Sequence, residues 1–95
     1  MEPTYAFFQN KFVNLSEAKL GAMTNFLHYG TGVFEGIRGN WNDNKGKIFL
    51  FCLEEHYERL HKGCQILKID LPYSVEKMCQ ITTELVKKCG YKEDV

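Results

Sequence analysis

The sequence predicts an α+β fold: a small two-layer domain in which two β-hairpins form an antiparallel sheet packed by two helices. Three observations lead to this class. Short aromatic and β-branched runs, separated by turn-forming residues, occupy the first half of the chain. Apolar residues then recur every three or four positions, which is the spacing of one helix face. A second helical pattern with clear start and stop signals follows it.

The first hairpin is expected near the start of the chain. Residues 5–8 and 12–15 are apolar runs, and the intervening Gln9-Asn10-Lys11 places Asn10 in the turn. Residues 16–21 read as a loop or a single helical turn that leads into a glycine-rich segment.

The second hairpin is expected between residues 34 and 53. Residues 34–41 can be extended, residues 42–46 are a cluster of turn formers, and residues 48–53 return as a strand. The return strand is apolar without alternation. This pattern predicts cover on both of its faces, either by the helices of this domain or by a partner surface.

Two helices should complete the domain. Over residues 54–68, the apolar positions that form one helical stripe are Leu53, Tyr57, Leu60, Cys64 and Leu67. Pro72 ends this pattern, because the residue before a proline is pushed away from helical angles. The second helix has Ser74 as its N-cap and Gly90 as its stop signal. Residues 91–95 either fray or lead into further polypeptide.

Composition limits both the architecture and the partners. Ninety-five residues make one domain that buries only roughly 60 to 65% of its unfolded surface. The formal net charge is zero, which argues against nucleic acid as a partner. No apolar run approaches membrane-spanning length and no secretion signal is present, so we expect a cytoplasmic protein without a membrane partner.

The four cysteines are expected to be reduced, buried thiols. Cys64, Cys79 and Cys89 lie on apolar helix faces, and Cys52 ends a strand that looks buried. No CxxC pair exists. His56 and His61 are five residues apart, which misses the spacing that would aim both rings at one metal ion, so no metal site is expected.

Residues 28–39, HYGTGVFEGIRG, combine four glycines with two aromatic residues and an arginine. Glycines permit tight turns and close approach of a ligand to the backbone, and aromatic side chains can line an apolar cavity. The segment is therefore a candidate pocket wall. From the residues alone, strand and turn structure with the aromatic rings in the core accounts for it equally well.

HYGTGVFEGIRG, with EEHYERLHKGC further along, resembles the N-terminal small domain of the branched-chain amino-acid aminotransferases, fold-type IV enzymes that use pyridoxal phosphate. The resemblance extends from FFQNKFVNLSEAKL to ILKIDLPYS and the last helix. D-amino-acid aminotransferases and aminodeoxychorismate lyases, in the same group, usually carry a GDGVFE-like segment where this chain reads GTGVFE. Those activities remain the alternative within the enzyme class.

The resemblance assigns roles to four residues. Arg59, within HYERLH, matches the arginine that binds the coenzyme phosphate; from the residues alone, an ion pair with Glu55 one helical turn away is the simpler interpretation. Phe34 and Gly36 match substrate-pocket positions. Tyr29 matches a residue that reaches the pocket of the neighbouring subunit, which implies a homodimer or a higher homo-oligomer.

Other polar residues are expected to be structural. Glu35, Arg38 and Trp41 are less specific: an arginine in a strand beside a pocket could meet a carboxylate, but a charge in a hairpin is more often solvated. His28 and His61 are treated as structural, because the resembled family assigns its proton transfers to a lysine.

The implied reaction moves the amino group between leucine, isoleucine or valine and 2-oxoglutarate. It requires a lysine that holds the coenzyme as a Schiff base and an acidic partner for the pyridine nitrogen. Neither is recognisable, so no catalytic residue is expected in this chain. Residues 1–95 are expected to be the small domain of a class IV aminotransferase without its larger C-terminal domain, and inactive alone. A non-catalytic module that binds a protein partner through residues 48–53 is the alternative from another class.

Overall fold

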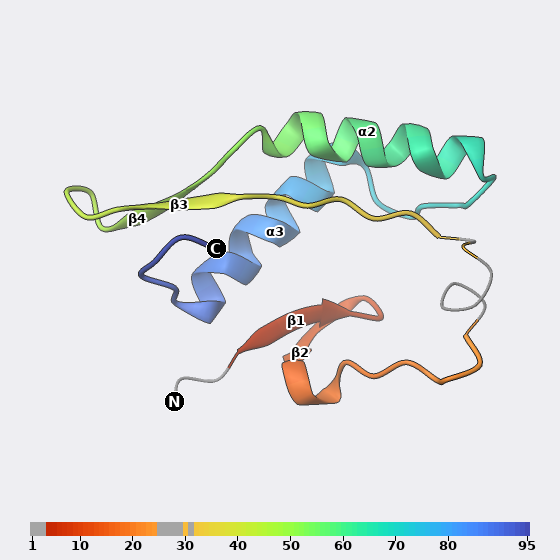
Figure 1. The fold of residues 1–95 in the computed structure, drawn as a ribbon, viewed down its shortest axis with the longest axis horizontal. Coiled ribbons are helices and arrows are strands. Elements are labelled where there is room, and N and C mark those ends of the chain that lie inside the picture. Colours follow the sequence, from red (N-terminus) through yellow and green to blue (C-terminus); the bar gives the residue numbers. More distant parts are fainter. Residues whose placement is uncertain (1–3, 25–29, 31) are drawn as a thin grey trace.

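Two β-hairpins and two α-helices make up the part of the chain that the computed structural model describes, residues 4–24, 30 and 32–95 (Figure 1). This is the α+β class that the sequence predicts. The elements in chain order are β1 (Tyr5–Phe8), β2 (Lys11–Asn14), the short 3-10 helix η1 (Leu15–Glu17), β3 (Gly39–Asn42), β4 (Lys47–Leu50), α2 (Leu53–Ile66) and α3 (Val75–Cys89).

The first hairpin is confirmed, with its second strand starting one residue earlier than expected. β1 and β2 are antiparallel, and Phe8 pairs with Lys11 across a two-residue turn. Gln9 and Asn10 both have positive φ angles, 49° and 70°. Turns with this left-handed backbone match the right-handed twist of the flanking strands, which explains why so short a connection closes the hairpin.

The second hairpin is also confirmed, but its ladder is shorter than the apolar pattern suggests. β3 and β4 pair from Gly39 opposite Leu50 to Asn42 opposite Lys47. The expected cover on both faces of the return strand is wrong for the described residues. Phe49 and Phe51 are 47% and 62% exposed, whereas Ile48 and Leu50 are half-buried. Successive side chains of a strand point to opposite faces, and only one face of β4 is covered.

α3 begins where the sequence predicts, and α2 begins one residue earlier than expected, at Leu53. In α3, the Ser74 Oγ accepts a hydrogen bond from the Lys77 backbone N at 3.0 Å, and Gly90 follows the helix with a φ of 67°. In α2, the helix ends at Ile66, two residues earlier than expected, and Lys68 has a φ of 57°. The two helices are linked by a hydrogen bond between the hydroxyls of Tyr57 and Thr82.

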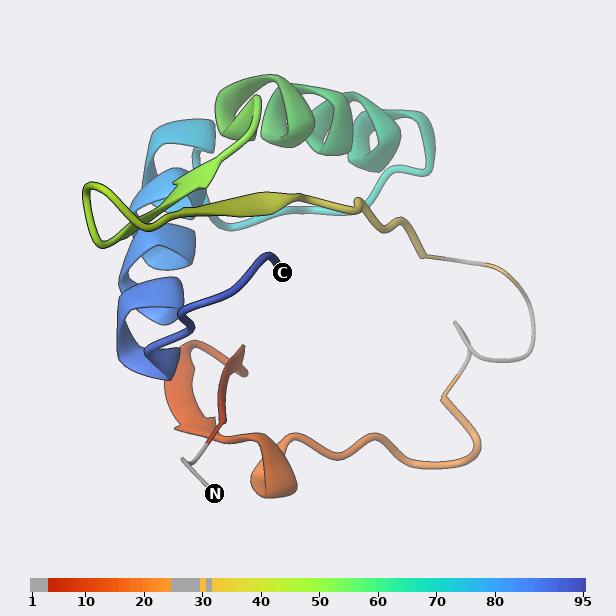
Figure 2. The same cartoon turned by 60° about the vertical axis from the view of Figure 1, so that its left-hand side comes forward.

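The elements are stacked around α3. In both views α2 and the β3–β4 hairpin lie on one side of α3, and the β1–β2 hairpin lies on the other (Figure 1 and Figure 2). The Cys89 Sγ donates to the Tyr5 carbonyl oxygen at 3.5 Å, which ties α3 to β1. The two hairpins therefore remain two separate two-stranded sheets among the described residues, rather than sharing one.

The last residues are bound, so the expectation that they fray is wrong. The backbone N and O of Val95 pair with the O and N of Gly39 at 2.9 and 2.8 Å. The Trp41 backbone N donates to the Asp94 Oδ1 at 2.7 Å. This segment runs between β3 and the β1–β2 hairpin in both views (Figure 2).

The apolar core is thin. Of the apolar side chains in the described residues, only those of Cys64 and Cys89 are buried. All four thiols are free, but burial is confirmed only for Cys64 and Cys89. Cys79 is half-buried, and Cys52 is exposed because it lies in the turn between β4 and α2. Within the described ranges, neither helix has the length and apolar character needed to span a bilayer.

Candidate functional site

An ion pair joins the segment before β3 to the middle of α2. The Glu35 Oε2 accepts from the Arg59 Nε at 2.9 Å, and the Glu35 Oε1 accepts from the Arg59 Nη2 at 2.5 Å. The Glu35 side chain is only 13% exposed, whereas the Arg59 side chain is 67% exposed. The Glu35 carboxylate is therefore largely shielded from solvent, whereas the Arg59 guanidinium is mostly exposed.

His56 is the third member of this group, which we call the Glu35 cluster (Glu35, His56 and Arg59). The His56 Nδ1 lies 2.7 Å from the Glu35 Oε1. Because a carboxylate only accepts, the network assigns a hydrogen to Nδ1, which donates to Glu35. The 3.2 Å contact between the Arg59 Nη2 and the same Nδ1 is then a contact between two donors that share one carboxylate.

The local sequence explains how the cluster forms. His56 and Arg59 are three residues apart on α2, so they lie on the same helix face. The segment before β3 can approach that face closely because α2 carries Gly63. A Cβ on Gly63 would lie 3.3 Å from the Val33 Cγ1, tighter than an ordinary van der Waals contact. Glu35 follows two residues later and meets the two donors.

The contacts within the Glu35 cluster favour the charged forms of both Glu35 and Arg59. Hydrogen bonds from Arg59 and then from His56 lower the pKa of Glu35 from its ordinary 4.5 to about 2. The hydrogen bonds of Glu35 raise the pKa of Arg59 in turn. At neutral pH the site consists of one ionised carboxylate and one guanidinium.

Arg59 retains the capacity to bind an anion. A guanidinium has five N–H donors, and Glu35 occupies one on Nε and one on Nη2, so three remain. Its planar fork suits two parallel hydrogen bonds to a phosphate. The donor set therefore fits the phosphate of pyridoxal phosphate. The partner of Arg59 is Glu35 rather than Glu55, so the simpler interpretation of the helix pattern is wrong.

The other candidate residues lie beside the cluster without enclosing a cavity. Phe34 is 84% exposed, which argues against the interpretation that its ring is core. A Cβ on Gly36 would meet nothing within 4 Å. Both flank Glu35 in sequence, so they lie near Arg59. Tyr29 and His28 lie outside the described residues.

The remaining polar candidates make local contacts. The Arg38 Nε donates to the Asn40 Oδ1 at 3.0 Å, and the Trp41 Nε1 donates to the Asp43 Oδ1 at 2.5 Å. Both contacts stay within the second hairpin. On α2, the His61 Nε2 is buried and has no hydrogen-bond partner among the described residues.

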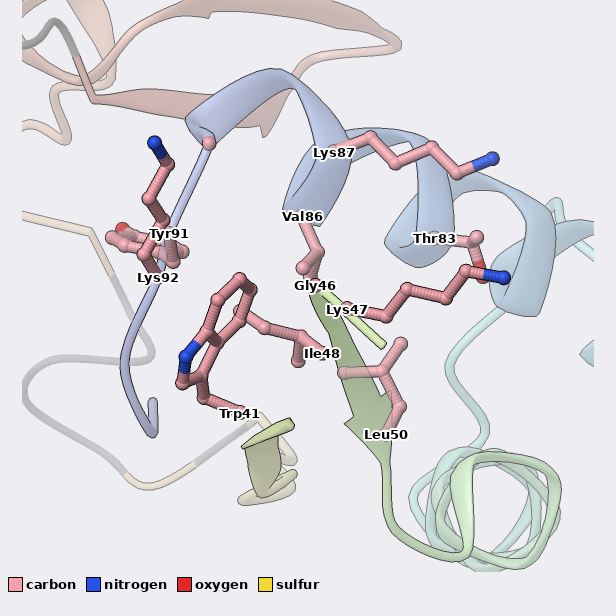
Figure 3. Close-up of a pocket in the computed structure, with 11 residues that line it drawn as sticks. Trp41, Gly46, Lys47, Ile48, Leu50, Thr83, Val86, Lys87, Tyr91 and Lys92 are labelled. Atoms are coloured by element: carbon pink, nitrogen blue, oxygen red, sulfur yellow. The ribbon is translucent and has the colours of Figure 1, made fainter. Parts of the chain in front are cut away.

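A pocket of about 520 Å³ lies elsewhere, between the second hairpin and the C-terminal half of α3 (Figure 3). Trp41, Ile48 and Val86 meet on its apolar side, while Lys47 and Lys87 extend along its edge. Its lining includes none of the residues that the sequence singles out for the coenzyme or the substrate.

Glu35 is the member of the cluster that sequence reasoning undervalues. It lies 24 residues from Arg59 and 21 from His56, so no local spacing rule connects them. The sequence did contain a signal for this pairing. Glu35 is an acidic residue in the same motif as Phe34 and Gly36, and Arg59, in the second motif, needs a counterion.

Known proteins resemble the chain along most of its length. The family model for amino-transferase class IV matches residues 32–94. A protein named "probable branched-chain-amino-acid aminotransferase" from Aquifex aeolicus is 44% identical over 91 residues, which cover 96% of this chain and 29% of that protein. The branched-chain-amino-acid aminotransferase of Escherichia coli strain K12 is 33% identical over 84 residues, 88% of this chain and 26% of that protein.

Solved structures of branched-chain aminotransferases are also similar to this chain. The branched-chain aminotransferase of Thermoproteus uzoniensis, crystallised with norvaline, has a TM-score of 0.88 and 36% identity over 97% of this chain and 30% of its own. The Thermobaculum terrenum enzyme in its PLP form has a TM-score of 0.87 and 32% identity, over 98% of this chain and 30% of its own. The chain thus spans about 30% of the length of these relatives. Because the family model covers well over half of its residues, the chain belongs to the class IV aminotransferases.

Proposed function

We propose that this chain is part of a branched-chain amino-acid aminotransferase, which exchanges an amino group between leucine, isoleucine or valine and 2-oxoglutarate. The observation that carries the proposal is the outward-facing guanidinium of Arg59, held by Glu35 between Phe34 and Gly36 in sequence. The resemblance of the surrounding residues to branched-chain enzymes supports it.

Each candidate residue has a role in this proposal. Arg59 donates hydrogen bonds to the phosphate of pyridoxal phosphate, which supplies an electron sink for the substrate when bound. The exposed ring of Phe34 gives an apolar wall for a branched aliphatic side chain, and Gly36 leaves room beside it. Tyr29 reaches the pocket of a neighbouring subunit, so the enzyme acts as a homodimer or a higher homo-oligomer, in the cytoplasm.

We further propose that residues 1–95 form the small domain of a longer enzyme whose larger domain supplies the lysine and the acidic partner. The surface supports this. The chain exposes 7510 Å², whereas a compact monomer of 11.1 kDa exposes about 5,700 Å². The excess includes Phe34, Phe49 and Phe51, which further polypeptide would cover.

Substrate trials on the longer protein test the activity. We expect transfer of the amino group from L-leucine to 2-oxoglutarate and no transfer from D-alanine. Activity with D-alanine and none with L-leucine would instead identify another fold-type IV enzyme. Absence of any amino transfer, together with capture of a protein partner by residues 48–53, would favour the interaction module.

A second test concerns the chain itself. Because it lacks the coenzyme lysine, the purified 95-residue protein should show no amino transfer and bind pyridoxal phosphate weakly. Mass spectrometry after borohydride reduction should then find no single lysine carrying the coenzyme. Stoichiometric attachment at one lysine of this chain would contradict the proposed division between two domains.

A further inference from the structure

We propose that Glu35 is a positioning residue for the coenzyme: it fixes the Arg59 guanidinium so that one edge of it is presented to the phosphate. This inference rests on the proposed function. Glu35 itself does not touch the coenzyme, and it acts through Arg59.

Glu35 occupies one edge of the Arg59 guanidinium. The two oxygens of the carboxylate accept from Nε and from Nη2, at 2.9 and 2.5 Å. This is a bidentate pair along one edge of the planar group. The second hydrogen of Nη2 and one hydrogen of Nη1 therefore remain available along the adjacent edge, and the other hydrogen of Nη1 is free on the third edge.

The pairing with Glu35 lowers the entropic cost of binding an anion at Arg59. A free arginine side chain loses rotamer entropy when it is ordered, and an anion that binds it has to offset this loss. Arg59 is 67% exposed, so packing alone does not fix it. A largely shielded carboxylate that accepts from two of its nitrogens orders the guanidinium before the phosphate binds.

The Glu35 side chain is itself held in place by His56. The His56 Nδ1 donates to the Glu35 Oε1 at 2.7 Å, and the side chains of His56 and Glu35 are 18% and 13% exposed. Two side chains on the same face of α2, those of His56 and Arg59, therefore bind the Glu35 carboxylate. Glu55 and Glu58, also on α2, are exposed, and the ion pair of Arg59 is with Glu35, which makes them suitable controls.

The experiment uses the full-length protein and compares two coenzyme forms. Dissociation constants for pyridoxal phosphate and for pyridoxal, which lacks the phosphate, are measured for the wild type, Glu35→Gln and the control Glu55→Gln. We expect Glu35→Gln to weaken pyridoxal phosphate binding roughly 10- to 100-fold, as for residues that orient metal ligands, and to leave pyridoxal binding unchanged. Glu55→Gln should change neither.

A double-mutant cycle then tests whether Glu35 acts through Arg59. In an Arg59→Lys background, the fork that Glu35 orients is gone, so adding Glu35→Gln should have no further effect on pyridoxal phosphate binding. A full additional loss in that background would overturn the inference.

One measurement needs no variant, in case Glu35→Gln fails to fold. Nitrogen-15 spectra of the wild-type protein should show slow solvent exchange of the Arg59 Nε–H compared with that of Arg38, whose partner is a neutral amide. Equal exchange at the two arginines would contradict the positioning role.

The outcomes separate this inference from the proposed function. Wild-type protein that binds neither coenzyme form would overturn the proposed function, and this inference with it. If Glu35→Gln binds pyridoxal phosphate as tightly as the wild type does, the positioning role of Glu35 is overturned and the proposed function is not. Equal losses for both coenzyme forms would show a general structural role, which also contradicts the proposal.

Discussion

The Glu35 carboxylate determines the charge at the candidate site, because it is the side chain that both His56 and Arg59 contact. Its pKa of about 2 means that it stays ionised down to strongly acidic pH. The Arg59 guanidinium therefore keeps an ionised partner throughout the physiological pH range. Anion binding by Arg59 should not be switched by physiological changes in pH.

The depressed pKa of Glu35 also predicts how stability depends on pH. The unfolded carboxyl titrates near 4.5 and the folded one near 2, so its contribution is complete above pH 4.5 and lost as the pH falls towards 2. The wild type should therefore be more stable than Glu35→Gln at pH 7, and the difference should shrink below pH 4.5. Urea unfolding at several pH values measures it. A difference that stays constant from pH 7 to pH 2 would contradict the ion pair.

Two nearby glycines should respond in opposite ways to alanine. A Cβ on Gly39 would lie 2.8 Å from the Ile48 Cγ2 and 3.0 Å from the Val95 Cγ2, so Gly39→Ala should destabilise the fold by roughly 1 to 3 kcal/mol. Gly36 has open space and no strained φ. Gly36→Ala should leave the unfolding transition unchanged, and in the full-length enzyme it should reduce the rate with leucine more than with a smaller aliphatic amino acid.

The glycine pair also separates folding from function. Loss of stability in Gly36→Ala comparable to that in Gly39→Ala would show that Gly36 is needed for packing. Unchanged substrate preference in a stable Gly36→Ala enzyme would argue against a place for Gly36 in the pocket.

At the scale of single elements, α3 is the best-defined part of the fold because both of its ends have a specific signal. The Ser74 Oγ caps the first turn through the Lys77 backbone N, and Gly90 adopts the left-handed conformation after the last turn. These are local interactions between neighbours in sequence, which is why the pattern of residues predicts them correctly.

Removing the α3 cap should have a measurable cost. Ser74→Ala deletes the acceptor for one otherwise unpaired backbone N–H, which should lower the free energy of unfolding by about 1 kcal/mol. Chemical denaturation measures the change, and Ser16→Ala at an exposed position of η1 is the matched control. Equal stabilities of Ser74→Ala and the wild type would mean that solvent replaces the cap.

Strands were harder to predict than helices. Residues 48–53 are apolar at every position, and this composition suggests burial on both faces. In the fold, Phe49 and Phe51 are exposed and the last two residues of that run belong to a turn and to α2. A continuous apolar run does not say which face a neighbour covers, because the neighbour is distant in sequence.

On the scale of the whole molecule, the fold is open. Its radius of gyration is 14.7 Å, whereas about 12 Å is typical of a compact domain of this length. The β1–β2 hairpin contacts α3, the β3–β4 hairpin faces α3 across the pocket, and the tail from Tyr91 to Val95 lies between the two hairpins (Figure 1 and Figure 2). The end of the chain therefore contributes to tertiary structure, although its sequence gave no sign of it.

The tail should protect part of the second hairpin. Deleting Asp94 and Val95 removes the acceptors for the backbone N–H groups of Gly39 and Trp41. We expect faster amide hydrogen exchange at these two positions in the shortened chain, with exchange at Met78 in α3 as the internal control. Unchanged protection of Gly39 and Trp41 would contradict the docking of the tail.

The sequence predicted the elements of this fold well and its site only in part. Hairpins, stripes and caps arise from residues within about one or two turns of each other. The pairing of Glu35 with Arg59 depends on how a segment packs across α2, and no periodicity encodes that contact. The resemblance to a known family singled out Arg59, but only the geometry shows the partly shielded carboxylate that pairs with it.

Coenzyme affinity in an Arg59 variant tests the central claim most directly. In the full-length protein, Arg59→Gln should weaken pyridoxal phosphate binding by roughly 100-fold, since hydrogen bonds to charged groups contribute about 1.5 to 3 kcal/mol each. Pyridoxal binding should be unchanged, and Lys62→Gln, which removes a neighbouring exposed cation of α2, should affect neither. Pyridoxal phosphate bound as tightly by Arg59→Gln as by the wild type would contradict the claim.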